Sequence, residues 1–283
     1  PSISKSGLIM VSDFGESVYS IGDSTFRFCY SMKSMYFPSC KTIGNNAFYS
    51  CYSLETISIP LCESIMDYAF AGGNVLRSID LPMCEYIGMK AFENAKISSL
   101  SLPRCKYLEA GAFSNNTMLS NISLPLLEHL GDAAFFGCNI SYVDLPLCEY
   151  VGGMAFHNCP LQSISLPNCT FIHSMAFHSQ TQLVSVSLPN VITIGSDAFA
   201  HCTNLTNVTL NNCKRISMEA FVSTNLTTLT ILTSEVCSVA DIVFRDTPIG
   251  NGVGSIYVPQ SLLSEYKNNQ TPWRDYSSII YGV

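Results

Sequence analysis

One pattern, repeated along most of the chain, limits the possible folds more than any other feature. Phenylalanines recur at spacings of 21 or 22 residues, and most of them follow an alanine. They are Phe26, Phe48, Phe70, Phe92, Phe113, Phe135, Phe156, Phe177, Phe199 and Phe221. A second series of the same period places an apolar residue before proline, at Pro38, Pro60, Pro82, Pro103, Pro125, Pro146, Pro167 and Pro189. Two independent series with one period are typical of a solenoid, in which each repeat buries its apolar face against its neighbours.

A single repeat shows which local structure to expect. Residues 56–59 read Thr-Ile-Ser-Ile, and this period of two predicts a short strand with one buried face. Pro60 ends that strand, because proline cannot donate to a ladder of parallel strands. The rest of the repeat is too short for a full helix with two loops. We therefore expect a second extended segment around Ile65 and a turn, or a single helical turn, near Ala69-Phe70.

The residue after the second isoleucine is often glycine. The glycines are Gly22, Gly44, Gly88, Gly131, Gly152 and Gly195. Met66, Glu109 and His173 occupy the same position in other repeats. Bulky residues rarely adopt a left-handed backbone, so we expect glycine to serve close packing here, or to be simply tolerated, and not to provide a positive φ.

These motifs resemble the BspA-like leucine-rich repeats of bacterial and some protozoan surface proteins. An isoleucine-glycine pair, a following Ala-Phe and a strand ending in Leu-Pro recur in fixed order over about residues 15–260. The resemblance implies a leucine-rich repeat solenoid, mostly β with short helical turns, of about ten 21–22-residue repeats, with one parallel sheet on the concave face. It also implies a non-enzymatic binding or adhesion module at the cell surface, with a host-matrix or other extracellular protein as its partner. The repeats are slightly short and carry Cys two residues after proline, so the ligand of an individual family member is not transferred.

We interpret residues 1–283 as a single repeat domain. Residues 1–20 are expected to form a degenerate first repeat, 21–232 the regular repeats, and 233–283 a degenerate repeat followed by a C-terminal cap.

The cap contains three recognisable features. Residues 256–258 predict a last strand before Pro259, and residues 261–267 predict a short helix with Ser261 as a candidate N-cap. Trp273 is the only tryptophan, and we expect it to cover the open end of the stack, because a solenoid must hide its last apolar face.

Composition excludes several classes of protein. Disorder is excluded because 47% of the residues are apolar and only 12% are charged. A formal charge of -7, with no Lys or Arg from Tyr107 to Cys213, argues against a nucleic-acid partner. No apolar run approaches the roughly 20 residues of a membrane-spanning helix. The chain begins Pro1-Ser2-Ile3 without a basic, apolar leader, so we take it as a mature or trimmed form of an extracellular protein whose signal and anchor lie elsewhere.

The 13 cysteines suggest disulfides or zinc, but their positions favour a structural role. Seven lie two residues after the proline position, at Cys40, Cys62, Cys84, Cys105, Cys148, Cys169 and Cys213. Five lie three residues after phenylalanine, at Cys29, Cys51, Cys138, Cys159 and Cys202, and Cys237 belongs to neither set. Stacked strands are about 4.8 Å apart, whereas a disulfide needs Cβ atoms near 3.8 Å. We therefore predict reduced, buried thiols, and without a Cys-x-x-Cys pair no zinc site.

All five histidines lie between His129 and His201. His157 and His178 occupy the same position in successive repeats, so their rings could approach each other. Two histidines without a third ligand make a poor metal site, and we interpret them as exposed turn residues. Cys159 and Cys202 each lie near a histidine, as a nucleophile near its base would, but both belong to the structural cysteine series. No catalytic residue, cofactor or metal is predicted, and we do not expect an enzyme.

Two surfaces are candidates for binding. The outward side of the strands before proline is rich in hydroxyls, and on it we single out Tyr36, Asp80, Tyr142 and Asp144. Such hydroxyls suit a partner that offers many hydrogen bonds, although they also favour β structure and keep a sheet face soluble.

The second surface, the aromatic row, lies four residues after the proline in five successive repeats. It consists of Tyr86, Tyr107, His129, Tyr150 and Phe171. Outward aromatic residues anchor protein partners, stack on sugar rings or brace the edge of a solenoid. We take a protein partner as the main hypothesis and a glycan-binding module as its alternative. Because the row runs through a stretch poor in cations, the partner is expected to be neutral or positively charged.

Overall fold

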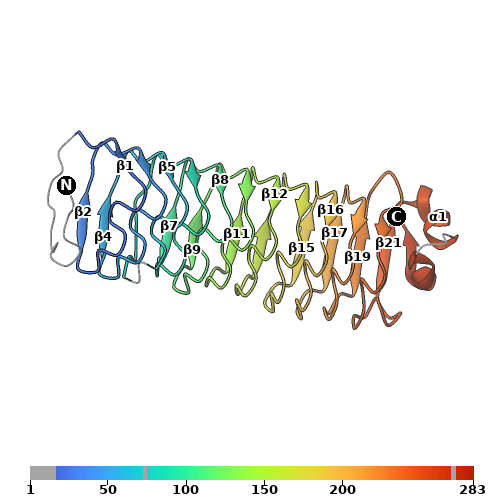
Figure 1. The fold of residues 1–283 in the computed structure, drawn as a ribbon. Helices are drawn as coiled ribbons and strands as arrows, with labels where there is room; N and C mark the ends of the chain where they lie inside the picture. The colour runs from blue at the N-terminus through green and yellow to red at the C-terminus, as the bar shows by residue number, and fades with distance from the viewer. Residues whose placement is uncertain (1–16, 73–74, 269–271) are drawn as a thin grey trace. The chain divides into compact units, whose positions relative to one another are not determined.

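The computed structural model describes residues 17–72, 75–268 and 272–283, so most of the expected first repeat lies outside the described residues. The chain divides into two compact units, the N-terminal unit at residues 1–140 and the C-terminal unit at residues 141–283. Each unit is a stack of parallel strands joined by short turns (Figure 1). This confirms the predicted solenoid. The assignment of all 283 residues to one domain stays a prediction.

In the N-terminal unit, the segments after proline form one ladder of two-residue strands. Its order is β1 (Ser20–Ile21), β3 (Thr42–Ile43), β5 (Ser64–Ile65), β6 (Tyr86–Ile87), β8 (Tyr107–Leu108) and β10 (His129–Leu130). The segments before proline pair in twos: β2 (Ser34–Tyr36) with β4 (Thr56–Ser58), and β7 (Ser99–Ser101) with β9 (Asn121–Ser123). Both extended segments of the repeat are therefore where the sequence predicts them.

The C-terminal unit has the same two series. After proline come β12 (Tyr150–Val151), β14 (Phe171–Ile172), β16 (Thr193–Ile194), β18 (Arg215–Ile216) and β20 (Ser238–Val239). Before proline, β11 (Tyr142–Asp144) pairs with β13 (Ser163–Ser165). A five-stranded sheet follows, in the order β15 (Ser185–Leu188), β17 (Asn207–Leu210), β19 (Thr228–Ile231), β21 (Ser255–Val258) and β22 (Ile280–Gly282).

The repeated phenylalanines fill the core of each unit. Consecutive rings stack nearly parallel, with centroids 5.0 Å apart between Phe48 and Phe70 and 5.3 Å apart between Phe177 and Phe199. From Phe48 to Phe221, every one of them is at most 1% exposed. The Ala-Phe period thus corresponds to a column of stacked rings in each unit, whose burial is a main source of stability.

The turns around each phenylalanine contain two left-handed residues, two positions before and two positions after the ring. Around Phe48 these are Asn46 (φ 55°) and Ser50 (φ 56°). The amide groups of Asn46, Phe48 and Ser50 donate to carbonyl groups of the next repeat at 2.9, 2.7 and 2.9 Å. Even Ile242 adopts φ 55° at the first position. A left-handed residue costs about 1–2 kcal/mol, and the hydrogen bonds between repeats offset that strain.

The glycine after the isoleucine serves close packing, as predicted. Gly44, Gly88, Gly131 and Gly195 do not have positive φ angles. An added Cβ at any of them would lie within 2.8 Å of backbone atoms of the preceding repeat. Glycine at these four positions therefore lets neighbouring turns approach each other.

The prediction of reduced, buried thiols is confirmed for nine cysteines, which are free and buried. They are Cys40, Cys51, Cys62, Cys84, Cys105, Cys169, Cys202, Cys213 and Cys237. After proline, each thiol donates to a carbonyl two residues on, as Cys84 does to Tyr86 O at 3.3 Å. Burial raises the pKa of Cys84 to about 12, so it stays protonated.

At the position three residues after phenylalanine, the side chain donates to a backbone carbonyl of the preceding repeat. The Cys51 thiol donates to the carbonyl oxygen of Phe26, one repeat back, at 3.1 Å. Asn116 Nδ2 donates to Phe92 O at 2.8 Å, and its Oδ1 accepts from the Ile97 amide at 2.8 Å. Gln180 Nε2 donates to Phe156 O at 2.7 Å in the same way. Cys, Asn and Gln share this buried position because each supplies a donor to that carbonyl.

The C-terminal cap consists of β21, two 3₁₀ segments (Gln260–Leu262 and Pro272–Ile279), α1 (Leu263–Asn268) and β22. Trp273 is fully buried, and its indole N–H donates to Cys237 O at 2.6 Å. Its ring lies 6.0 Å from Phe244, the last ring of the column, which confirms the capping role. The prediction for Ser261 is wrong: it lies inside the first 3₁₀ segment, which follows Pro259 and has no side-chain cap. In the described parts of the chain, no helix has the length and apolarity needed to cross a membrane.

Candidate binding surfaces

The aromatic row faces outward in the N-terminal unit. Tyr86, Tyr107 and His129 are register partners on β6, β8 and β10. They alternate with core residues that are fully buried, such as Leu108, so their own side chains point away from the core. Tyr107 is 43% exposed, and its two neighbours are half-buried. The predicted alignment and outward direction are confirmed for this segment.

Carboxylates surround this part of the row. The Tyr107 hydroxyl donates to Glu128 Oε2 at 3.4 Å. Burial, and then the negative charges of Glu109 and Asp67, raise the pKa of Tyr86. The Tyr86 phenol therefore stays protonated near neutral pH, beside these carboxylates.

The row continues in the C-terminal unit with Tyr150 and Phe171, also in register. Their rings stack at 5.6 Å with an interplanar angle of 3°. His173, which sequence reasoning did not select, lies 6.3 Å from Tyr150 and 5.8 Å from Phe171 between ring centroids. Its place two residues after Phe171 is a signal that could have found it, because a period of two brings side chains to the same face.

The hydroxyl-rich surface is separate from the row. Tyr36 on β2 and Tyr142 and Asp144 on β11 are exposed, and their register partners are Ser58, Ser163 and Ser165. Asp80 is exposed as well but lies outside the assigned strands. All four belong to segments before proline, whereas the aromatic row belongs to the strands after it. The candidate residues thus form two surfaces and not one.

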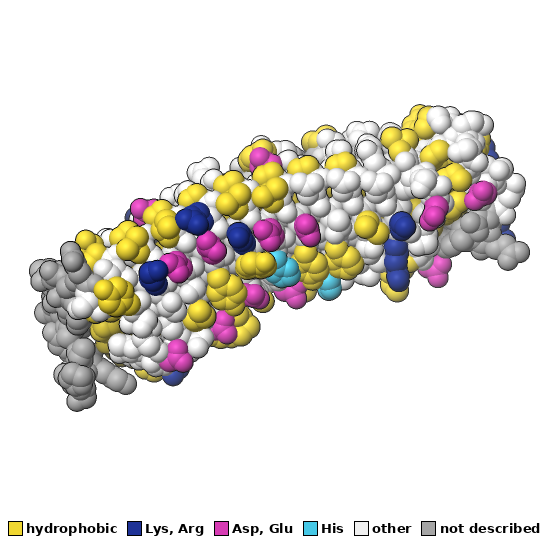
Figure 2. Space-filling view, turned by 90° about the horizontal axis from the view of Figure 1, so that it is seen from above, with side chains coloured by type: hydrophobic (Ala, Val, Ile, Leu, Met, Phe, Trp, Pro, Cys, Tyr) yellow, Lys and Arg dark blue, Asp and Glu magenta, His cyan; other side chains and the backbone are white. Residues whose placement is uncertain are grey.

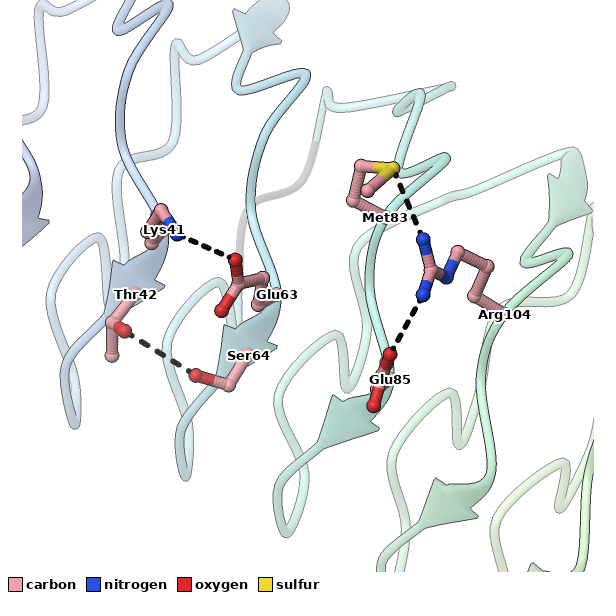
Figure 3. A network of polar contacts seen from close by, with 7 residues as sticks. All are labelled: Lys41, Thr42, Glu63, Ser64, Met83, Glu85 and Arg104. Carbon is pink, nitrogen blue, oxygen red and sulfur yellow. Dashed lines mark hydrogen bonds and ion pairs between the residues drawn. The ribbon is translucent and has the colours of Figure 1, made fainter.

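Ion pairs follow the proline turns of the N-terminal unit (Figure 3). Lys41 Nζ contacts Glu63 Oε1 at 2.9 Å, and Arg104 contacts both Glu85 Oε1 at 3.3 Å and Met83 Sδ at 3.8 Å. These charges are exposed, so each pair adds little to the stability of the fold. Figure 2 shows acidic and basic side chains interspersed with hydrophobic ones on one face. Both ion pairs join neighbouring repeats.

An exposed aromatic cluster near the start of the N-terminal unit escaped the sequence analysis. Tyr30 and Tyr52 stack at 5.4 Å and are 50% and 47% exposed. The Arg27 guanidinium lies 4.7 Å from the ring centroid of Phe28 and 5.2 Å from that of Tyr49. The 22-residue spacing of the two stacked tyrosines was the available signal.

Three histidines lie together in the C-terminal unit. The rings of His157 and His178 stack at 4.7 Å, as their common position predicts, and His201 lies 5.1 Å from His178. His157 and His178 are half-buried, so their interpretation as exposed residues is wrong. Burial, and then the nearby charges of His157 and His201, lower the pKa of His178 to about 4. Among the residues that the structure describes, no group of three or more His, Cys, Asp or Glu could hold a metal ion.

An asparagine ladder lies beside the proline turns of the C-terminal unit. Asn168, Asn190 and Asn212 donate from Nδ2 to proline carbonyls one repeat back, at 2.6, 2.7 and 2.8 Å. They line a hollow of about 520 Å³ together with Lys214 and Glu235. This edge is polar and mostly neutral, unlike the edge of the N-terminal unit.

Comparisons with known proteins agree with this architecture. A family model described as BspA type leucine rich repeat region matches the chain in six copies, over residues 6–119, 41–152 and 128–249. The fold is similar to that of a leucine rich cell surface protein from Faecalibacterium prausnitzii A2-165, with 19% identity, coverage of 94% of this chain and 84% of that one, and a TM-score of 0.54. It is also similar to the pneumococcal vaccine antigen PcpA, with 17% identity, coverage of 96% and 72%, and a TM-score of 0.50. No curated protein matches. Because the family model spans most of the repeats described above, this chain belongs to the BspA-type leucine-rich repeat family.

Proposed function

We propose that this chain is a non-enzymatic binding module of the cell surface, which recognises an extracellular or host-matrix protein through the aromatic row. The observation that carries the proposal is the outward alignment of Tyr86, Tyr107 and His129 on adjacent strands. Tyrosines are enriched among the residues that dominate binding energy, and a rigid ladder presents them at little entropic cost.

Charge favours a partner with basic side chains. Glu109, Asp67 and Glu128 lie next to Tyr86 and Tyr107, and the whole chain carries a formal charge of -7. A Lys or Arg of the partner would gain both attraction to these carboxylates and contact with a tyrosine ring.

The alternative, a glycan-binding module built on the same row, has less support. Sugars pack against an open ring face, but Tyr150 and Phe171 cover each other's faces at an interplanar angle of 3°. Stacked rings mainly offer their edges, and edges suit the side chains of a protein partner.

The surface location is supported by the family and by the name of one relative, a leucine rich cell surface protein. Adhesion to another protein is a role that a repeated sheet edge serves directly.

The proposal is tested by measuring the binding of the chain to a panel of purified extracellular-matrix proteins, alongside a glycan array. We expect at least one matrix protein to bind. Tyr107→Ser with Tyr150→Ser should then weaken binding at least about tenfold, as expected for residues that dominate an interface. The melting temperature should change by only a few degrees.

Tyr281→Ser is the matched control, because Tyr281 is also exposed but lies on β22 of the C-terminal cap. It should retain full binding. Unchanged binding by the double variant would eliminate the row, and binding confined to glycans would favour the alternative.

A further inference from the structure

We infer that the C-terminal unit contains a carboxylate-binding groove centred on Arg215. It accepts an acidic side chain or a C-terminal carboxylate of the partner, flanked by an apolar group. That the carboxylate belongs to a protein rests on the proposed function above. The groove itself rests on its own geometry and charge.

The groove continues the line of the aromatic row. Phe171, Thr193 and Arg215 are successive register partners on β14, β16 and β18. Two residues later, just after each strand ends, lie His173, Gly195 and Ser217. With Ser174 and Ser196 they line a hollow of about 310 Å³.

The charge of Arg215 is not neutralised by the protein. Arg215 is exposed, and the residues described by the structure place no carboxylate within ion-pair distance of it. The acidic residue four positions along, Glu219, is already engaged by Arg245 at 3.1 Å. An uncompensated guanidinium in a chain of formal charge -7 indicates that an anion completes this site.

The lining chemistry matches a carboxylate in particular. A guanidinium binds a carboxylate through two parallel N–H···O bonds. The hydroxyls of Ser196, Ser217 and Thr193 are available to donate to its remaining lone pairs. A phosphate would bring nearly two negative charges, which proteins usually meet with clustered arginines, and this lining holds one guanidinium.

The shape of the groove indicates why the carboxylate of the ligand should be flanked by an apolar group. At Gly195 the lining of the groove is backbone alone, packed closely on the preceding repeat, since an added Cβ would lie 2.6 Å from the backbone carbon of His173. One end is formed by Phe171, whose ring is already stacked on Tyr150 and presents an apolar edge. A ligand that reaches Arg215 with its carboxylate therefore has an aromatic surface beside it.

The test uses the whole chain and a matched pair of probes, N-acetylphenylalanine and N-acetylphenylalaninamide, followed by NMR titration. The acid should bind at least about tenfold more tightly than the uncharged amide, because only the acid can pair with the guanidinium. The shifted amide signals should come from residues 193–196 and 215–217. N-acetylglutamate α-amide, in which only the side chain is acidic, separates a side-chain source of the carboxylate from a C-terminal source.

Arg215→Gln should reduce binding of the acid to the level of the amide. Arg104→Gln, which removes an exposed arginine that already pairs with Glu85, is the control and should bind the acid normally. Ser196→Ala should cost a few-fold. Equal affinity for acid and amide, or an unchanged affinity in Arg215→Gln, would overturn the site.

The experiments distinguish a failure of the groove hypothesis from a failure of the proposed function. If Tyr107→Ser abolishes binding of a matrix protein but Arg215→Gln leaves it unchanged, the assignment of the groove to that partner is overturned. If no matrix protein binds, the probe titration still decides whether the groove exists.

Discussion

The edges beside the proline turns differ between the two units. In the N-terminal unit this edge carries ion pairs between successive repeats, Lys41 with Glu63 and Arg104 with Glu85. In the C-terminal unit the corresponding edge carries neutral amides, each bound to a proline carbonyl one repeat back, as in Asn190. The rings of the phenylalanine column are buried to the same degree in both units. The comparison teaches that the repeat constrains its inward positions and leaves the outward positions free to diverge.

The aromatic row shows the same divergence. Around Tyr86 and Tyr107 the neighbouring charges are carboxylates, whereas beyond Phe171 the line of the row ends at Arg215. The strands after proline thus present a surface suited to basic groups in the N-terminal unit and one suited to acidic groups in the C-terminal unit.

The largest effect is expected when one phenylalanine ring is removed from the core of each unit, and it tests whether the two cores contribute equally to stability. Phe113→Ala and Phe199→Ala should each lower the free energy of unfolding by about 3–5 kcal/mol, because both rings are fully buried and stacked on two neighbours. Urea denaturation followed by circular dichroism measures both. Leu126→Ala, at an exposed site, is the control and should cost less than about 1 kcal/mol. A loss in one unit more than twice that in the other would break the equivalence.

A smaller loss of stability is expected at the position where Asn in one unit and Gln in the other pair buried backbone groups. Asn116→Ala and Gln180→Ala each leave a buried amide and a buried carbonyl without the side chain that pairs them. Each should cost about 2–3 kcal/mol. Asn116→Cys should cost less than Asn116→Ala, because the Cys51 thiol satisfies the equivalent carbonyl elsewhere. Equal losses for the two Asn116 variants would contradict the donor role of this position.

Acid should distinguish the units, because only the C-terminal unit has neighbouring histidines. The pKa of His178 falls to about 4 from its usual 6.5, so the unfolded chain binds the proton more readily than the folded one. Protonation of this histidine therefore does not reduce the free energy of unfolding above pH 6.5, and it reduces that free energy progressively as the pH falls from 6.5 towards 4. Since the ring is partly solvated, we expect roughly 1 kcal/mol after allowing for screening.

Melting curves between pH 4 and 7 would measure the effect against His178→Gln. The groups that face this ring are His157, His201 and the Ser179 hydroxyl, and Asp197 acts on His201. The variant should lose part of the pH dependence. An unchanged pH profile would show that the stacked rings do not control acid stability.

The smallest losses of stability are expected for substitutions at the two edges beside the proline turns, and their salt dependence should differ. Lys41→Ala should leave the free energy of unfolding almost unchanged and show its small loss only at low salt, because both partners of its ion pair are exposed. Asn190→Ala should cost about 1 kcal/mol at any salt, because it removes a hydrogen bond to Pro167 O and the acceptor for Asn212. Denaturation at low and high sodium chloride compares them. A salt-dependent loss in Asn190→Ala would contradict its neutral character.

Periodicity was sufficient to predict the repeat, the two strands per turn, the buried thiols and the outward aromatic row. These features follow from the size and alternation of side chains within one repeat, and the same pattern recurs in each stacked repeat. It could not predict that Tyr68 and Met175 adopt left-handed backbones, because local preference opposes that conformation and only hydrogen bonds to the next repeat stabilise it.

The sequence by itself determined which residues lie inside, since a period of two and a period of 21–22 suffice to align apolar side chains. Only the tertiary structure decided which other outward side chains meet: His201 with His178, the aromatic cluster around Arg27, and the hydroxyls beside Arg215. The physical reason is that outward contacts join residues about 22 positions apart through rotamers and turn geometry, neither of which a linear pattern records.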